Sequence, residues 1–121
     1  MAQPRFIEHK GKKIYHIDLT NADLGQIQQI IKEAKPIISQ QAPGSLLTLT
    51  DVTNIVMGGE NSKAIKEFAA HNKPYVKAGA VLGISGLRQV TFNAVLVFTG
   101  RSNLHLFDDA QKAKDWLVAK G

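Results

Sequence analysis

The stretch SLLTLTD, residues 45–51, decides the fold. It is a nearly continuous run of apolar and β-branched residues, preceded by the turn sequence APGS at 42–45. A strand with one solvated face would alternate apolar and polar residues, whereas a run of this kind is typical of a strand buried on both faces. The stretch therefore predicts a central strand in a sheet that is covered on both sides.

Residues 20–42 precede this strand and predict a helix. Their apolar side chains recur at intervals of three and four: Leu24, Ile27, Ile31, Ala34 and Ile38. Thr20 or Asn21 is the expected N-cap, with Asp23 in the first turn. Pro36 lies inside the segment, so the helix is expected either to kink there or to break at Lys35 and restart with the proline.

A second helix and a second strand follow the central strand. The helix is predicted at 61–71, with Ala64, Ile65, Phe68 and Ala69 on one side and a stop at Asn72 and Pro74. The strand YVKAGAVLGI, residues 75–84, consists mostly of small and branched residues. Its glycines, Gly79 and Gly83, predict close approach by a neighbouring backbone or helix.

The two ends of the chain add a hairpin and a final strand–helix pair. Residues 5–9 and 13–19 are rich in β-formers and flank KGK, which predicts a hairpin with the lysine cluster Lys10–Lys13 at a solvated turn. Residues 103–107 predict a short strand. Residues 108–120 predict a helix capped by Asp108, with three residues facing inward: Ala113, Trp116 and Leu117.

The segment 85–101, SGLRQVTFNAVLVFTGR, can be read as a strand or as a helix. Its β-propensity is high, but Ser85 is a good N-cap, Gly100 suits a helix end, and apolar residues recur at helical spacing. We predict a helix over 87–98. The order β-β-α-β-α-β-α-β-α then indicates one α/β domain spanning residues 1–121, with a mixed sheet covered by helices.

Composition excludes several kinds of site. The 121 residues include no cysteine, so disulfides and thiolate zinc sites are ruled out, and the four histidines lack metal-ligand spacing. We expect no metal and no cofactor. The net charge of +5 is spread out and only 7% of residues are aromatic, so we expect no nucleic-acid partner. The sequence shows no apolar leader and no stretch of about eighteen apolar residues, which predicts a cytoplasmic protein without an integral membrane segment.

The loop after the central strand is one candidate site, because ligands of such sheets bind at the carboxyl ends of the strands. A phosphate on Ser62 would gain from the helix N-terminus, although Asn61 or Ser62 is more simply an N-cap. Gly58 and Gly59 are either an anion-binding nest or turn residues with positive φ. Asp51 is either a general base or holds the loop through backbone N–H groups of residues 52–54.

The predicted helix over 87–98 is the second candidate, because its apolar residues cover more than one face. Phe92, Val95 and Leu96 would form a homodimer seam or a partner groove, with polar edges from Ser85, Arg88 and Arg101. Alternatively, this helix and the sheet would enclose a small apolar or lipid-like ligand. No convergent acid, base and nucleophile is evident, so we expect no enzyme.

Several blocks together resemble the SpoIIAA-like proteins of bacteria, which are related to STAS, the anti-sigma-factor antagonist domain, and grouped as STAS/SEC14-type. The blocks are SLLTLTDV, a helix containing IKEF, NKPYVKAGAVLGISGL, FTGR and FDDAQKAKDWL. The resemblance runs from Phe6 to Leu117 and is most specific between Lys73 and Arg101. It implies strands and helices wound as a β-α superhelix.

The resemblance also implies a kind of activity. Classical STAS antagonists are not enzymes; they dock on a partner kinase or anti-sigma factor and are switched by phosphorylation of a serine at the start of the helix after the third strand. That serine lies in an Asp-Ser-Ser-Gly type motif, whereas this chain reads VMGGENSKA, with Ser62 as the nearest hydroxyl. The SEC14 side of the grouping implies a lipid cavity. We therefore expect a non-catalytic binding or regulatory domain, with an apolar-ligand carrier as the alternative.

Overall fold

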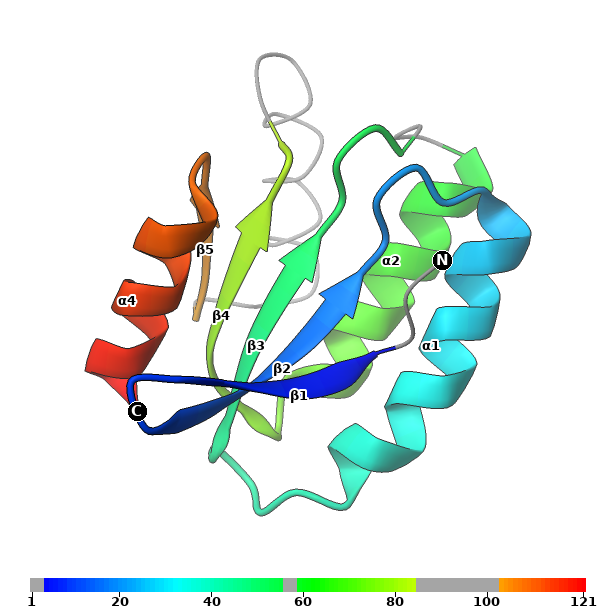
Figure 1. Cartoon of the computed structure of the whole chain (residues 1–121). Coiled ribbons are helices and arrows are strands. Elements are labelled where there is room, and N and C mark those ends of the chain that lie inside the picture. The colour runs from blue at the N-terminus through cyan, green and yellow to red at the C-terminus, as the bar shows by residue number, and fades with distance from the viewer. Residues whose placement is uncertain (1–3, 56–58, 85–102) are drawn as a thin grey trace.

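The strands lie in the sheet in the order in which they occur in the chain (Figure 1). The computed structural model describes residues 4–55, 59–84 and 103–121. The strands are β1 (Arg5–His9), β2 (Lys12–Asp18), β3 (Leu46–Asp51), β4 (Val76–Leu82) and β5 (Leu104–Phe107). β1 pairs antiparallel with β2, and β2 to β5 run parallel. The predicted α/β class, the N-terminal hairpin and the mixed sheet are confirmed.

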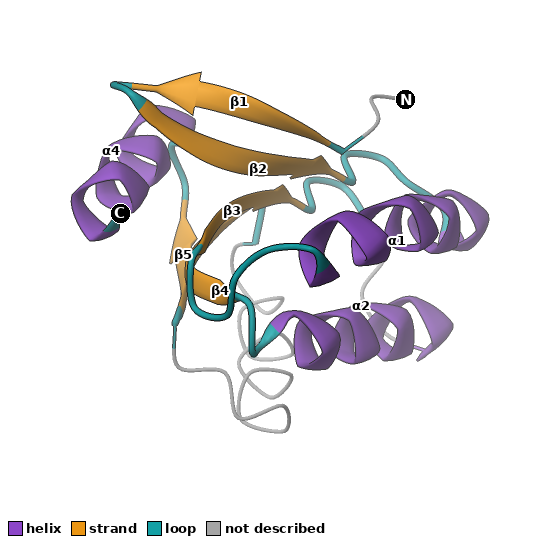
Figure 2. Cartoon of the chain, turned by 90° about the horizontal axis from the view of Figure 1, so that it is seen from below, coloured by secondary structure: helices purple, strands orange, loops and turns teal. Residues whose placement is uncertain are grey.

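Helices cover both faces of this sheet (Figure 2). α1 (Leu24–Ser39) and α2 (Gly59–Asn72) pack on one face, where Tyr15, Ile27 and Phe68 belong to one buried cluster. α4 (Ala110–Lys120) packs on the other face, where Leu49 and Leu117 belong to a second buried cluster. The helix predicted over 87–98 lies outside the described residues. No helix in the described part of the chain is long and apolar enough to cross a membrane.

β3 is the central strand that its sequence predicts. Leu46, Leu47, Thr48 and Leu49 are all buried. Successive residues of a strand point to opposite faces, so Leu47 and Leu49 contact the cluster under α4 while Leu46 contacts the cluster under α1 and α2. Because both faces of β3 pack against apolar clusters, its sequence does not alternate between apolar and polar residues.

α1 begins one turn later than Thr20 or Asn21 would place it, so those two predicted caps are wrong. Asp23 is the N-cap: its Oδ1 accepts a hydrogen bond from Gln26 N at 2.8 Å, and Gln26 Oε1 accepts one from Asp23 N at 3.0 Å. Asn21 has a φ of 59°, which differs from the extended backbone typical of an N-cap. The break expected at Lys35 is also wrong, because α1 runs through Pro36 to Ser39.

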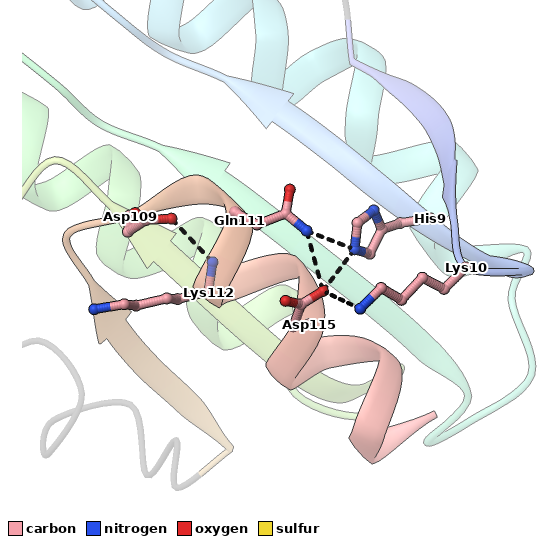
Figure 3. Close-up of polar contacts among 6 residues, drawn as sticks. All are labelled: His9, Lys10, Asp109, Gln111, Lys112 and Asp115. Atoms are coloured by element: carbon pink, nitrogen blue, oxygen red, sulfur yellow. Dashed lines mark hydrogen bonds and ion pairs between the residues drawn. The ribbon is translucent and has the colours of Figure 1, made fainter.

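The starts of α2 and α4 also differ from expectation. α2 begins at Gly59, so Asn61 and Ser62 lie in its first turn and neither is the N-cap. Asp109, not Asp108, caps α4, since Asp109 Oδ1 accepts a hydrogen bond from Lys112 N at 3.0 Å (Figure 3). The faces were predicted correctly: in α2 the buried side includes Ile65, Phe68 and Ala69, and in α4 it includes Ala113 and Leu117, with Trp116 half-buried.

Of the two glycines, Gly83 lies against a neighbouring backbone, as predicted, whereas Gly79 on β4 lies against side chains of the neighbouring strands and not against a backbone or a helix. A Cβ added at Gly79 would overlap the Leu104 side chain on β5 and lie 2.8 Å from Thr48 Oγ1 on β3. Gly83 has a φ of 92°, and a Cβ there would lie 2.5 Å from the backbone nitrogen of Thr53. These two positions let β4 lie between its parallel neighbours and turn directly beside the loop that follows β3.

Candidate functional site

The carboxyl ends of β2, β3 and β4 are joined into one edge by backbone hydrogen bonds. Leu19 N donates to Asp51 O at 2.8 Å, Asn21 N to Thr53 O at 2.9 Å and Val52 N to Leu82 O at 2.9 Å. Each bond links the segment after one strand either to the last residue of the next strand or to the segment after that strand. The loops at this edge are therefore held in a defined relation to one another before any ligand or partner arrives.

Two carboxylates reinforce the same edge. Asp18 and Asp51 are register partners at the ends of β2 and β3. Asp18 Oδ1 accepts a hydrogen bond from Thr20 N at 3.0 Å, and Asp51 Oδ1 accepts from Thr53 N at 3.0 Å and from Thr53 Oγ1 at 2.5 Å. Of the two alternatives for Asp51, the structure confirms that it holds its loop through a backbone N–H group.

α2 begins at this edge as well, so its first turn lies beside the loops that follow the strands (Figure 1). Gly59 is the first residue of α2 and has the positive φ that the sequence predicts, 55°, a value that fits both alternatives for this glycine. Asn61 and Ser62 are half-buried in the turn that follows. The structure thus places Asp51, Gly59, Asn61 and Ser62 at one end of the fold, while Gly58 lies outside the described residues.

A polar group on the α4 face of this edge was not recognised from sequence. His16 and Asp18 are two residues apart on β2, on the same face as Ile14, and Arg5 is the register partner of His16 on β1. Burial lowers the pKa of His16; Asp18 and Asp51 oppose that shift, and Arg5 and Lys114 add to it. Period-two alternation along β2 could have grouped His16 with Asp18, but Arg5 and Asp51 join them only through the pairing of the strands.

The environment of Asp18 favours its charged form. Burial by itself raises the pKa of this carboxyl, but the hydrogen bonds from Thr20 and the charge of His16 outweigh burial and hold the pKa below its usual range. Asp18 is therefore an ionised loop-fixing group at neutral pH. A carboxylate in this state is suited to bonding N–H groups rather than to donating a proton.

We expect His16 to make the fold less stable below about pH 6.5, the ordinary pKa of histidine. Because burial lowers the pKa of His16 in the folded chain, the unfolded chain binds more protons just below 6.5, and stability falls as the pH falls through that window. Urea unfolding at pH 7.5 and 5.5 should show a larger loss for the natural chain than for His16→Gln. Equal losses would contradict the assignment. Asp18, whose pKa is also lowered, loses its contribution only at more acid pH.

The hairpin turn is fastened to α4 at the opposite end of the sheet (Figure 3). Asp115 Oδ1 lies 2.8 Å from His9 Nε2 and 3.0 Å from Lys10 Nζ, and it accepts a hydrogen bond from Gln111 Nε2 at 3.2 Å. The hydrogen bonds from His9 and Lys10 lower the pKa of Asp115. Lys10 and Asp115 are exposed and His9 is half-buried, so these contacts orient the turn and contribute modestly to stability.

Three other kinds of site considered from the sequence are an apolar cavity, a metal site and the predicted apolar surface of residues 85–101. A cavity of about 40 Å³ lies between the sheet and α2; it is lined by residues such as Phe68, Val81 and Leu104 and has room for a few waters. The described ranges hold no group of three or more histidine or acidic side chains placed to bind a metal.

The residues of the predicted partner or ligand surface lie outside the described ranges: Ser85, Arg88, Phe92, Val95, Leu96 and Arg101.

Comparison of the chain with protein-family models, with curated proteins and with solved structures finds no match. The site is therefore interpreted from its own geometry and from the residues that form it.

Proposed function

We propose that this chain is a non-catalytic binding or regulatory domain of STAS-like type that acts through protein–protein contacts at the carboxyl edge of the sheet. One observation carries the proposal: the carboxylates of Asp18 and Asp51 are engaged in fixing their own loops. The edge is thereby a preorganised surface, and preorganisation reduces the entropy that a docking partner must lose.

The arrangement of strands supports the STAS-like assignment. Sequential strand order, with parallel strands joined through α1 and α2 on one face, is what a β-α superhelix requires. The chain also begins with a hairpin and ends with a helix, which agrees with the element order that the resemblance favours. Pairing of two copies through Phe92, Val95 and Leu96 belongs to the same proposal and is tested by the mass of the intact species in native mass spectrometry.

Ser62 is the residue through which such a surface would be switched. It lies in the first turn of α2, where the helix dipole favours a phosphate. Lys63 and Lys66 follow within one turn and supply positive charge close by. Phosphorylation would add about two negative charges to the docking edge.

The experiment is affinity capture of partners with three variants of the purified chain. Ser62→Asp should retain at least tenfold less partner than the natural chain, because it places a charge at the edge. Ser39→Asp is the matched control: Ser39 is exposed at the other end of the helical layer, as the last residue of α1, and its variant should bind normally. Circular dichroism should show that all variants are folded.

Two results would count against the proposal. Equal capture by Ser62→Asp and Ser39→Asp would remove the carboxyl edge as the docking surface. Identical behaviour of Ser62→Ala and Ser62→Asp would leave docking in place and exclude the charge switch.

A further inference from the structure

The amino edge of the sheet, opposite to the docking edge, carries a cluster of lysines around two adjoining hollows. The larger hollow, about 400 Å³, is lined by Lys12 and Lys13 of β2 and by Lys77 of β4. The smaller, about 160 Å³, is lined by Lys77 again and by Lys120 of α4. Lys77 thus lies between the two hollows, and four ammonium groups border one continuous strip of surface.

These lysines are not neutralised within the part of the chain that the structure describes. The ion pairs there join His9 and Lys10 to Asp115, and none includes Lys12, Lys13, Lys77 or Lys120. Glu8 is the register partner of Lys13 across the hairpin, but no ion pair forms between them. No acidic side chain is among the described residues that line the two hollows, so the lysine charges give them a positive potential that concentrates anions.

Ordinary structural roles explain only part of the cluster. Lys120 lies in the last turn of α4, where a cation balances the helix dipole. Lys77 has no such explanation, because it is the exposed residue of a strand whose other six residues are buried. Lys12 and Lys13 are also strand residues, beyond the turn formed by Lys10 and Gly11. Three of the four lysines therefore have no role in a helix end or a turn.

We propose that this lysine strip is a second binding surface, for an extended acidic segment of a polypeptide rich in aspartate and glutamate. The single tryptophan, Trp116, lines the smaller hollow, but its ring is packed against His105 at 4.7 Å and Phe107 at 5.4 Å between centroids. Lys120 lies 5.6 Å from the same ring. A ring that is half-buried and already packed against two other rings is a poor platform for stacking bases, which disfavours single-stranded nucleic acid.

The remaining lining residues disfavour the other polyanions. No arginine lines either hollow, so the bidentate contacts typical of phosphate and base recognition are missing from this strip. Leu47 and Ala78 are the apolar lining residues besides Trp116, and both are buried, so they cannot insert into a membrane. Lysine ammonium groups pair well with single carboxylates, which an acidic peptide supplies in series. The surface is separate from the carboxyl edge and does not depend on the function proposed there.

The test uses a fluorescein-labelled octaglutamate peptide and the whole chain, followed by fluorescence anisotropy. Lys12→Glu with Lys77→Glu should weaken binding at least tenfold. Lys32→Glu with Lys35→Glu is the matched control, because it changes the net charge equally on α1, in a groove facing α2, and should weaken binding less than threefold. Raising the salt concentration should weaken binding of the natural chain, because exposed charges are screened.

Three results would overturn this inference: no binding of octaglutamate at low salt, equal weakening by the two double variants, or tighter binding of an eight-nucleotide single strand or of phosphatidylserine vesicles than of octaglutamate. If the double glutamate variant does not fold, Lys12→Gln with Lys77→Gln removes the charges without reversing them. That variant should still weaken binding, and unchanged binding would contradict the proposal. Neither double variant should alter partner capture that depends on Ser62.

Discussion

Replacing Gly83 by alanine is expected to destabilise the fold by about 3 kcal/mol or more, close to the limit of what a small domain tolerates. Two costs add at this position. The φ of 92° lies in a region that residues with a Cβ rarely adopt, and the new methyl group would lie 2.5 Å from Thr53 N and 2.6 Å from Thr53 Cα. Because these atoms belong to the backbone, they cannot move aside as the end of a flexible side chain can.

Gly44→Ala separates the two costs. Gly44 has a φ of 66°, and an added Cβ there would meet no atom within 4 Å, so only the conformational cost of about 1 kcal/mol applies. Urea unfolding of both variants measures the difference, which we attribute to the contact with Thr53. Equal losses at the two positions would show that the close approach of Gly83 to Thr53 does not exist in solution.

The contact at Gly83 also matters for the docking edge. Thr53 is the residue whose N–H and hydroxyl bind the Asp51 carboxylate, and its carbonyl accepts the hydrogen bond from Asn21 N. Moving Thr53 to accommodate a methyl group would therefore disturb the turns after both β2 and β3. We expect the folded fraction of Gly83→Ala to bind partners more weakly than Gly44→Ala does.

Much of this fold could be predicted because hydrophobic patterning is a local signal. The run at 45–51 identified the central strand, and the spacing of Ile27, Ile31 and Ile38 identified the buried face of α1. The helix starts were harder, because several capping residues occur close together. Asp108 and Asp109 are chemically equivalent, and only the path of the chain out of β5 decides that Asp109 reaches Lys112 N.

The polar group around His16 shows what local patterns leave out. Asp18 and Asp51 are 33 positions apart in the sequence, and they meet because β2 and β3 pair in parallel with a particular register. Hydrophobic runs predict that strands exist but do not determine which strands are neighbours or how they are aligned. The lysine strip was missed for the same reason, since Lys12, Lys77 and Lys120 come together only in the folded chain.

Leu117→Ala is expected to destabilise the fold by about 3 kcal/mol, within the range for removing a fully buried leucine. Leu117 is 0% exposed and, with Ala113, anchors α4 against the buried cluster that includes Leu47 and Leu49 of the central strand. Ala113 is small and Trp116 is only half-buried, so Leu117 is the one large side chain of α4 that is fully buried in this cluster. The loss would leave a cavity between α4 and β3 that the rigid sheet can only partly close.

Trp116 makes this prediction measurable, because it is the single tryptophan of the chain and lies next to Leu117 on α4. Unfolding in urea followed by tryptophan fluorescence and by far-ultraviolet circular dichroism should give coincident transitions, since α4 cannot leave without exposing the core face of the sheet. Val118→Ala, at a half-buried position of the same helix, is the control and should cost less than about 1 kcal/mol. A fluorescence transition well before the dichroism transition in Leu117→Ala would instead mean that α4 undocks separately, and equal losses in the two variants would mean that Leu117 does not hold the helix.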